Sequence, residues 1–331
     1  MARSKELEEK IIELYNSGLS MAAVGREVGK ASTVVFTVLN KYNIPKRTKG
    51  GIYKLPAEEI IDKYVNQKRT LESIRKDYGV TINTVKKVLL DNNCSIRNSS
   101  ESKNPHFNQN FFEKIDNEAA AYYLGFMITD GCVLEPDISN NHPNYKMKLE
   151  LQDQDKYILE QLKEQLRLTS ANLYQAKRIK NNSISITNSL GWFSTKMAND
   201  LAKYGVVPRK TSTVYLPKIS KDMMPHLIRG LIDGDGCITI THSNGLPRLA
   251  ISFCGNETLV TQLRDYLVKE LKIHNAVIEH IQPNLWQISW GGKNDCLKIC
   301  EYIYQDATFY LTRKKDKYLK MSKYYDNTEV I

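Results

Sequence analysis

Two short stretches with one pattern decide the fold, Tyr123-Leu-Gly-Phe-Met-Ile-Thr-Asp-Gly131 and Ile228-Arg-Gly-Leu-Ile-Asp-Gly-Asp-Gly236. Each is a mainly apolar helical run that stops at an Asp-Gly pair, which is a turn signal. Small residues four positions apart give each helix one face that a partner backbone can approach closely. These residues are Gly125 and Thr129 in the first stretch and Gly230 and Gly234 in the second. The sequence therefore predicts two helices packed face to face.

In such a pair Asp130 and Asp235 lie side by side where both helices end. Unpaired carbonyls and the helix dipole favour a cation there, and carboxylate oxygens suit Mg²⁺. A single Asp-Gly is most often only a turn, so the duplication decides between the two interpretations. Asp130 and Asp235 are 105 residues apart, and the matched pairs Arg209-Lys210 and Arg313-Lys314 are 104 apart. This common register indicates an internal repeat with a site in each half.

These residues resemble the LAGLIDADG homing endonucleases, in the single-chain form with two motifs, over roughly Phe111 to Met321. The resemblance implies an α+β fold in which tandem αββαββα repeats form a pseudo-twofold saddle. It also implies a monomer of the kind encoded by mobile introns or phages, which cuts double-stranded DNA at a specific site. Two or three Mg²⁺ ions would assist, with Mn²⁺ able to substitute. The second motif fits closely, whereas the first has Ile128 where the family often has an acid.

The resemblance also assigns roles to individual residues. Catalysis falls to the two acids and the two matched lysines, and the metal ligands are the acids with the glycines that follow them. The implied catalytic residues are Asp130, Asp235, Lys210 and Lys314, and the implied metal-site residues are Asp130, Asp235, Gly131 and Gly236. Without the repeat, each lysine would be interpreted as an ordinary surface residue.

The N-terminal part predicts two small all-α helix-turn-helix domains. Ile11, Ile12 and Tyr15 form an apolar helical stripe that returns 49 residues later, and Gly29 and Gly79 mark matching turns. Any three-helix bundle could produce such stripes, but the doubling and the basic excess favour DNA binding. The expected domains are modules at 1–50 and 51–97, a polar linker at 98–110, and repeats at 111–217 and 218–331.

Strands with one polar face are expected in both repeats, as in the alternation of Lys146–Gln152. Such a face often meets only water, but mixed basic and polar side chains also suit the major groove. Predicted DNA contacts lie on the third helix of each module, the run after the first module, the strands, and the matched arginines. They are Ser32, Thr33, Thr37, Asn40, Lys46, Arg47, Asn83, Thr84, Lys86, Lys87, Lys146, Lys148, Lys177, Arg178, Lys180, Arg209, Arg248, Gln287 and Arg313.

Composition agrees with a nucleic-acid partner. The chain of 331 residues has a formal net charge of +10, which points to a polyanion. Its six cysteines show no Cys-x-x-Cys spacing, so free thiols in a reducing compartment are expected, either the cytoplasm or an organelle matrix. The N-terminal stretch has no apolar core for a signal peptide, and no apolar run approaches membrane-spanning length.

Two other functions remain open from the sequence. A DNA-binding transcription regulator could use the same saddle without cutting, and an RNA-splicing maturase could use it on structured RNA. The retained Asp130 and Asp235 favour cutting, since a protein that only binds DNA has no need for two negative charges facing phosphate.

Overall fold

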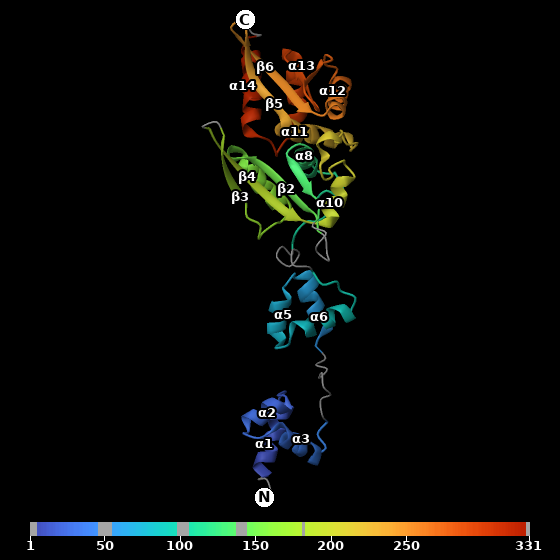
Figure 1. The fold of residues 1–331 in the computed structure, drawn as a ribbon, viewed down its shortest axis with the longest axis vertical. Coiled ribbons are helices and arrows are strands. Elements are labelled where there is room, and N and C mark those ends of the chain that lie inside the picture. The colour runs from blue at the N-terminus through green and yellow to red at the C-terminus, as the bar shows by residue number, and fades with distance from the viewer. Residues whose placement is uncertain (1–4, 46–54, 98–105, 137–143, 181–182, 329–331) are drawn as a thin grey trace. The chain divides into compact units, whose positions relative to one another are not determined.

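The computed structural model describes residues 5–45, 55–97, 106–136, 144–180 and 183–328. The chain divides into two units, Met1–Ile96 and Arg97–Ile331. The fold class is the predicted α+β: a helical N-terminal region is followed by two four-stranded antiparallel sheets (Figure 1).

The N-terminal unit contains two sets of short helices, each with its own apolar core. The first set is α1 (Lys5–Asn16), α2 (Met21–Glu27) and α3 (Ser32–Lys41). The second is α4 (Ala57–Ile61), which continues as a π-helical turn to Asn66, then α5 (Leu71–Tyr78) and α6 (Ile82–Asp91). The predicted turn glycines both have positive φ, +63° at Gly29 and +61° at Gly79. Glycine reaches this left-handed region without the Cβ clash of other residues.

The two sets share a nearly constant register. Tyr15 and Tyr64 are both buried, as are Leu39 and Leu89 fifty residues apart. The apolar periodicity of the third helix predicts that Val34 points inward, but this prediction is wrong, because Val35 fills that place and is fully buried, as is Val85. A helical turn of 3.6 residues allows either neighbour to face the core when both are valines, so the sequence alone could not separate them.

The C-terminal unit begins with the first αββαββα repeat. Its elements are α8 (Glu118–Ile128), β1 (Gly131–Leu134), β2 (Lys146–Gln152), α9 (Lys156–Gln165), β3 (Tyr174–Lys180), β4 (Ser183–Phe193) and α10 (Thr195–Ala202). The strand order is β1-β2-β4-β3. The sequence predicts a closing helix over residues 192–204, but Trp192 belongs to β4, where it pairs with Met147, and the helix begins at Thr195.

The second repeat follows the same plan and then adds one more helix. Its elements are α11 (Met224–Asp235), β5 (Gly236–Ser243), β6 (Leu246–Gly255), α12 (Glu257–Leu271), β7 (Ile278–Gln282), β8 (Leu285–Trp290), α13 (Lys293–Tyr304) and α14 (Thr312–Thr328). The strand order β5-β6-β8-β7 matches that of the first sheet. The predicted repeat is therefore confirmed element by element, with α14 as the addition.

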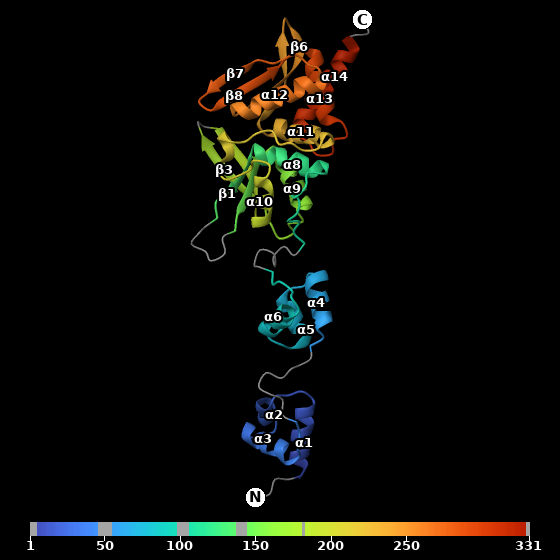
Figure 2. The ribbon, with the colours of Figure 1, turned by 90° about the vertical axis from the view of Figure 1, so that its right-hand side faces the viewer.

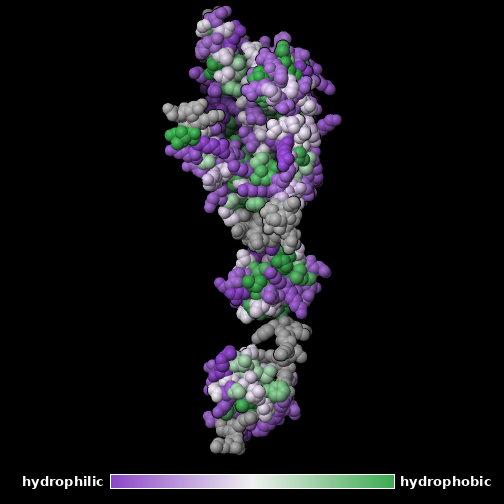
Figure 3. Space-filling view, viewed as in Figure 1, coloured by the Kyte–Doolittle hydropathy of each residue, from purple (hydrophilic) through white to green (hydrophobic). Residues whose placement is uncertain are grey.

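The motif helices α8 and α11 lie side by side between the two sheets (Figures 1 and 2). Nearly every residue of α8 is buried, which explains why this helix is apolar on all sides rather than amphipathic. Helices α9 and α10 cover the first sheet, and α12, α13 and α14 cover the second. One continuous core joins the halves, while the exposed surface in view is mainly hydrophilic with scattered apolar patches (Figure 3).

Candidate active site

The helix pair makes its closest approach at the predicted small residues. A Cβ added at Gly125 would lie 2.6 Å from the Leu227 carbonyl oxygen and 2.7 Å from the Gly230 Cα, and one at Gly230 would strike the Tyr122 carbonyl oxygen. A Cβ at Gly234 would strike Thr129 Oγ1. Backbone therefore packs directly against backbone, and this contact brings the ends of α8 and α11 together.

The two acids meet at that end. Asp130 directly follows the C-cap of α8, Asp235 is the last residue of α11, and an added Cβ at Gly234 would lie 2.7 Å from Asp130 Oδ2. Both carboxylates are open to solvent on one side, yet protein atoms surround them closely. Burial and the neighbouring Asp235 charge raise the pKa of Asp130 to about 6, and burial raises the pKa of Asp235. The arrangement thus crowds two like charges at one point.

Both predicted lysines lie beside the acids. Lys210 and Lys314 are buried, and burial lowers the pKa of each, in the case of Lys314 to about 8. Each ammonium lowers the pKa values of Asp130 and Asp235. The fold therefore brings together the four residues that the resemblance implied, two from each half.

The donor set suits a hard divalent cation. Two carboxylates and the carbonyl groups at two helix ends are oxygen ligands, with no thiolate or imidazole in the set. Among the described residues there is no cluster of three or more His, Cys, Asp or Glu that could hold a metal alone. Mg²⁺ is commonly bound by one or two carboxylates plus waters and substrate phosphates. The residues present fit Mg²⁺ or Mn²⁺ taken up together with a phosphate, with Asp130, Asp235 and the neighbouring Gly131 as the holding groups. The carbonyl oxygen of Gly236, also predicted as a ligand, already accepts a hydrogen bond from the Lys314 ammonium at 2.7 Å.

The polar face of the first sheet gathers basic residues. Lys146, Lys148 and Glu150 alternate with buried Met147, Leu149 and Leu151, as predicted. The register places Arg178 on the same face, where it contacts Glu150 at 2.9 Å, and Lys148 contacts Glu150 at 2.6 Å.

Two further predicted contacts on β3 differ from these. Lys177 pairs with Ile186 and therefore alternates to the opposite face, so the structure does not bring it together with Arg178. Lys180 ends β3, and its side chain lies outside the described residues.

The corresponding face of the second sheet is nearly neutral. Arg248 of β6 pairs with Thr241 of β5, and Gln287 of the adjacent strand β8 pairs with Cys254 of β6. Arg248 and Cys254 point to the same side of β6, so both predicted residues lie on one face. Gln287 also donates to Ser289 Oγ at 3.0 Å. The two faces of the protein thus offer different chemistry, charged in the first half and mainly hydrogen-bonding in the second.

The matched arginines have different surroundings. Arg209 is 85% exposed and only approaches Glu135 at 3.5 Å, so it is available to a ligand. Arg313 is held by Asp155 of the first half through three contacts of 2.9–3.2 Å. A guanidinium that is already paired with a buried carboxylate is better suited to linking the two repeats than to binding DNA.

The N-terminal candidates lie on the third helix of each set. On α3, Ser32, Thr33, Thr37 and Asn40 are all exposed. On α6, Asn83 and Lys87 are exposed, whereas Lys86 and Thr84 are partly covered and the Thr84 hydroxyl pairs with Thr81 Oγ1 at 2.9 Å. Lys46 and Arg47 lie outside the described residues.

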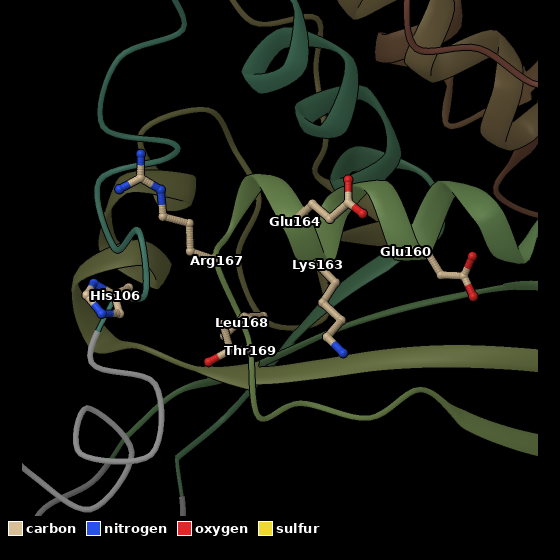
Figure 4. Close-up of a pocket in the computed structure, with 7 residues that line it drawn as sticks. All are labelled: His106, Glu160, Lys163, Glu164, Arg167, Leu168 and Thr169. Atoms are coloured by element: carbon tan, nitrogen blue, oxygen red, sulfur yellow. The ribbon is translucent and has the colours of Figure 1, made fainter. Parts of the chain in front are cut away.

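A pocket of about 690 Å³ opens elsewhere on the C-terminal unit (Figure 4). It lies at the C-terminal end of α9 and is lined by His106, Glu160, Lys163, Glu164, Arg167, Leu168 and Thr169. Neither acid nor lysine of the site lines it. This pocket is therefore separate from the candidate site, where Asp130 and Asp235 are exposed.

Several important residues near the site were not predicted. Arg229 of α11 is fully buried and donates to the carbonyls of Ile303 and Phe309, each at 2.6 Å, and to Glu118 at 2.6 Å. Asp233 is buried and accepts from Tyr122 Oη and the Leu311 N–H, both at 2.8 Å. A charged residue inside an apolar helical run was the signal that could have identified both, because a buried charge needs partners.

Comparison with known proteins gives a likeness to solved structures only. No protein-family model matches the chain, and no curated protein matches it. The LAGLIDADG homing endonuclease I-SmaMI bound to cleaved DNA is 13% identical, with 64% of this chain and 91% of that chain covered and a TM-score of 0.43. The LAGLIDADG meganuclease I-AabMI bound to uncleaved DNA is 12% identical, with 64% and 92% covered and a TM-score of 0.43.

A third structure, the LAGLIDADG homing endonuclease I-GzeII in complex with its DNA target, is 11% identical, with 64% and 92% covered and a TM-score of 0.46. I-SmaMI has also been solved on uncleaved DNA in the presence of calcium ions, at 13% identity, the same coverage and a TM-score of 0.42. At these values the likeness says nothing about this chain's chemistry, which depends on its own side chains. None of the helices in the described part of the chain has the length and apolar character needed to span a membrane.

Proposed function

We propose that this protein is a site-specific endonuclease that hydrolyses phosphodiester bonds in double-stranded DNA with the help of divalent metal ions. The observation that carries the proposal is the crowding of Asp130 and Asp235 at the end of two close-packed helices. Such crowding is costly without a cation. A divalent ion relieves it, and the open surface beside it admits a duplex.

The protein's own residues have distinct tasks in this reaction. Asp130 and Asp235 would hold Mg²⁺ or Mn²⁺, which when bound supplies positive charge to the phosphate and acidifies a water. The glycine contact between α8 and α11 fixes where the two carboxylates lie. Lys210 and Lys314 add positive charge at the same point, so that negative charge on the reacting phosphate is stabilised. With one acid from each half, a single chain carries a site for each DNA strand and acts as a monomer.

The polar faces of the two sheets support binding of the duplex. Lys146, Lys148 and Arg178 can contact phosphate or guanine, while Gln287 and Arg248 can contact base edges in the major groove. The two N-terminal helical sets act as additional DNA-binding modules of the helix-turn-helix kind. Their exposed third helices offer Thr33, Thr37, Asn40, Asn83 and Lys87 to the major groove.

A second candidate is a DNA-binding regulator that does not cut. It is favoured by the two helical sets, which a nuclease core does not need for chemistry. A maturase would instead prefer structured RNA. Binding of structured RNA and duplex DNA, compared side by side, separates the maturase from the other two, and a cleavage assay separates the nuclease from the regulator.

The test uses duplex DNA from the region that flanks the protein's own gene, incubated with Mg²⁺, with the cut ends mapped. Asp130→Asn and Asp235→Asn should each abolish double-strand cleavage, because each removes a metal ligand. Both should leave DNA affinity within about tenfold, because neither contacts bases. A matched control is Asp153→Asn, an acid of the first half outside the site that bonds Asn188 and Gln175. Cleavage at the wild-type rate by both site variants would rule out the assignment, and binding without any cleavage by the wild-type protein would favour the regulator.

A further inference from the structure

The lysines Lys210 and Lys314 occupy matched places in the two repeats but are bound differently. The Lys314 ammonium donates to the carbonyl oxygens of Ile232 (2.6 Å), Asp233 (2.8 Å) and Gly236 (2.7 Å). An ammonium has three N–H donors, so all three are used. Lys314 is 3% exposed, and its donors therefore close the C-terminal end of α11 rather than face solvent.

Lys210 has donors to spare. Within the described residues its ammonium makes one hydrogen bond, to the Thr129 carbonyl oxygen at 3.2 Å. Two N–H groups remain for a ligand. The side chains that act on it electrostatically are Asp235, Cys132 and Asp130, so these donors lie beside the two acids, where a phosphate held by them would come.

The backbone around the two lysines explains the difference. Lys314 lies in the first turn of the 17-residue helix α14, whereas Lys210 lies in a three-residue turn, Lys210–Ser212. One turn after Lys314, Lys317 donates to the Ile238 carbonyl oxygen at 3.0 Å. The residue three positions after Lys210 is Thr213, which cannot reach in the same way.

These bonds act on the segment that carries Asp235. Strand β5 is at the edge of its sheet, and edge carbonyls have no strand partner on their open side. Lys314 and Lys317 satisfy the carbonyls of Gly236 and Ile238, and Lys314 also satisfies the last turn of α11. Helix α14 thus clamps the junction between α11 and β5 on both sides of Asp235. Strand β1, the edge strand after Asp130, has no matching helix in the described part of the first repeat.

We propose that the two lysines have unequal roles in the function proposed above, on which this inference rests. Lys314 is a positioning residue that fixes the helix end carrying Asp235, and Lys210 is the lysine that contacts the DNA phosphate. The equal catalytic roles expected from the sequence are thereby replaced by one anchoring and one reacting lysine.

The experiment compares Lys314→Met with Lys210→Met, which remove the same charge from the matched position. Without DNA, thermal unfolding is followed by tryptophan fluorescence, since all three tryptophans lie in the C-terminal unit. Lys314→Met should lower Tm by roughly 5 °C or more, because several buried carbonyls lose their donor, while Lys210→Met should stay within about 2 °C. Hydrogen exchange at Gly236–Ile238 should accelerate only in Lys314→Met.

Cleavage at varied Mg²⁺ then separates positioning from catalysis. Lys314→Met should need at least about tenfold more Mg²⁺ for half-maximal rate and recover near wild-type rate at high Mg²⁺, because its Asp235 carboxylate is misplaced but present. Lys210→Met should stay slow at every Mg²⁺ concentration. If Lys314→Met does not fold, Lys317→Met should give smaller shifts of Tm, exchange and Mg²⁺ dependence in the same directions.

Opposite results overturn the inference in distinct ways. Equal Tm losses in both methionine variants, or unchanged exchange at Gly236–Ile238 in Lys314→Met, would show that Lys314 is not an anchor. A slow Lys314→Met that Mg²⁺ does not restore would show that it reacts like Lys210. If the wild-type protein does not cut DNA, the proposed nuclease function fails, while the unfolding and exchange measurements still decide whether Lys314 anchors α11.

Discussion

Replacing Gly230 by alanine should separate the two motif helices and weaken both stability and cleavage. The added Cβ would strike the Tyr122 carbonyl oxygen and lie 3.0 Å from the Gly125 Cα. Ordinary carbon contacts are about 3.5–4.0 Å. The obstructing atoms are backbone in a buried helix, so no side chain can rotate away, and α8 and α11 must move apart by the order of 1 Å.

The size of the effect follows from two opposing contributions. Overpacking in a dense core costs about 1–3 kcal/mol, and a contact with rigid backbone belongs at the upper end. Alanine is a better helix former than glycine by about 1 kcal/mol, which offsets part of that cost. We expect the free energy of unfolding to fall by about 2 kcal/mol. Because the helices carry Asp130 and Asp235, a 1 Å displacement should also slow cleavage by about 100-fold.

Urea unfolding monitored by tryptophan fluorescence measures the stability effect. All three tryptophans, Trp192, Trp286 and Trp290, lie in the C-terminal unit, so the signal reports only on that unit. Gly291→Ala is a suitable control, because a Cβ there meets no atom within 4 Å. If Gly230→Ala is as stable as the wild type or more so, helix propensity dominates and the close-contact argument is refuted.

Two further predictions concern the buried charges. Arg229→Met should lower the free energy of unfolding by about 3–5 kcal/mol in the same fluorescence assay, because it leaves Glu118 without its arginine and two buried carbonyls without a donor. The exposed control Arg248→Met, in the same unit, should change it by less than about 0.5 kcal/mol. Burial and Arg229 lower the pKa of His226 below 6.5, although Glu118 and Asp306 oppose this. At this histidine the unfolded state therefore binds more protons than the folded state. The free energy of unfolding of the wild type, taken relative to that of His226→Gln, should be full above pH 6.5 and decline as the pH falls below it. Parallel pH profiles of the two proteins would contradict this.

The fold could be predicted because the small residues that let the two motif helices pack together recur at a fixed spacing. Gly125 and Gly230 allow close approach, and their 105-residue spacing fixes the register of everything between. The alternation of polar and apolar residues in β2 predicted directly which side of the strand faces solvent, because successive side chains in a strand point to opposite sides. Where two similar residues compete for one place, as Val34 and Val35 do, periodicity cannot choose between them.

The site was predictable to a lesser degree. Asp130 and Asp235 could be paired from sequence, because the helices that end in them had to pack. The sequence could not show that Arg313 is already paired with a carboxylate, because its partner Asp155 is 158 residues away and belongs to the other half. Such long-range ion pairs depend on how the repeats dock, which the pattern within one repeat does not describe.

The matched lysines show why a repeat in sequence need not be a repeat in chemistry. Duplication places Lys210 and Lys314 at nearly equal distances along the chain from their acids, 80 and 79 residues, but the segments that follow differ in length and in structure. In the three-residue turn, the ammonium of Lys210 has one acceptor among the described residues, whereas the long helix α14 holds the Lys314 ammonium against three carbonyl oxygens. A buried ammonium with every donor satisfied gains little from a phosphate, because it would have to break existing hydrogen bonds to contact one. The two repeats therefore share a lysine at the matched position, but the role of each lysine depends on the number of acceptors around it.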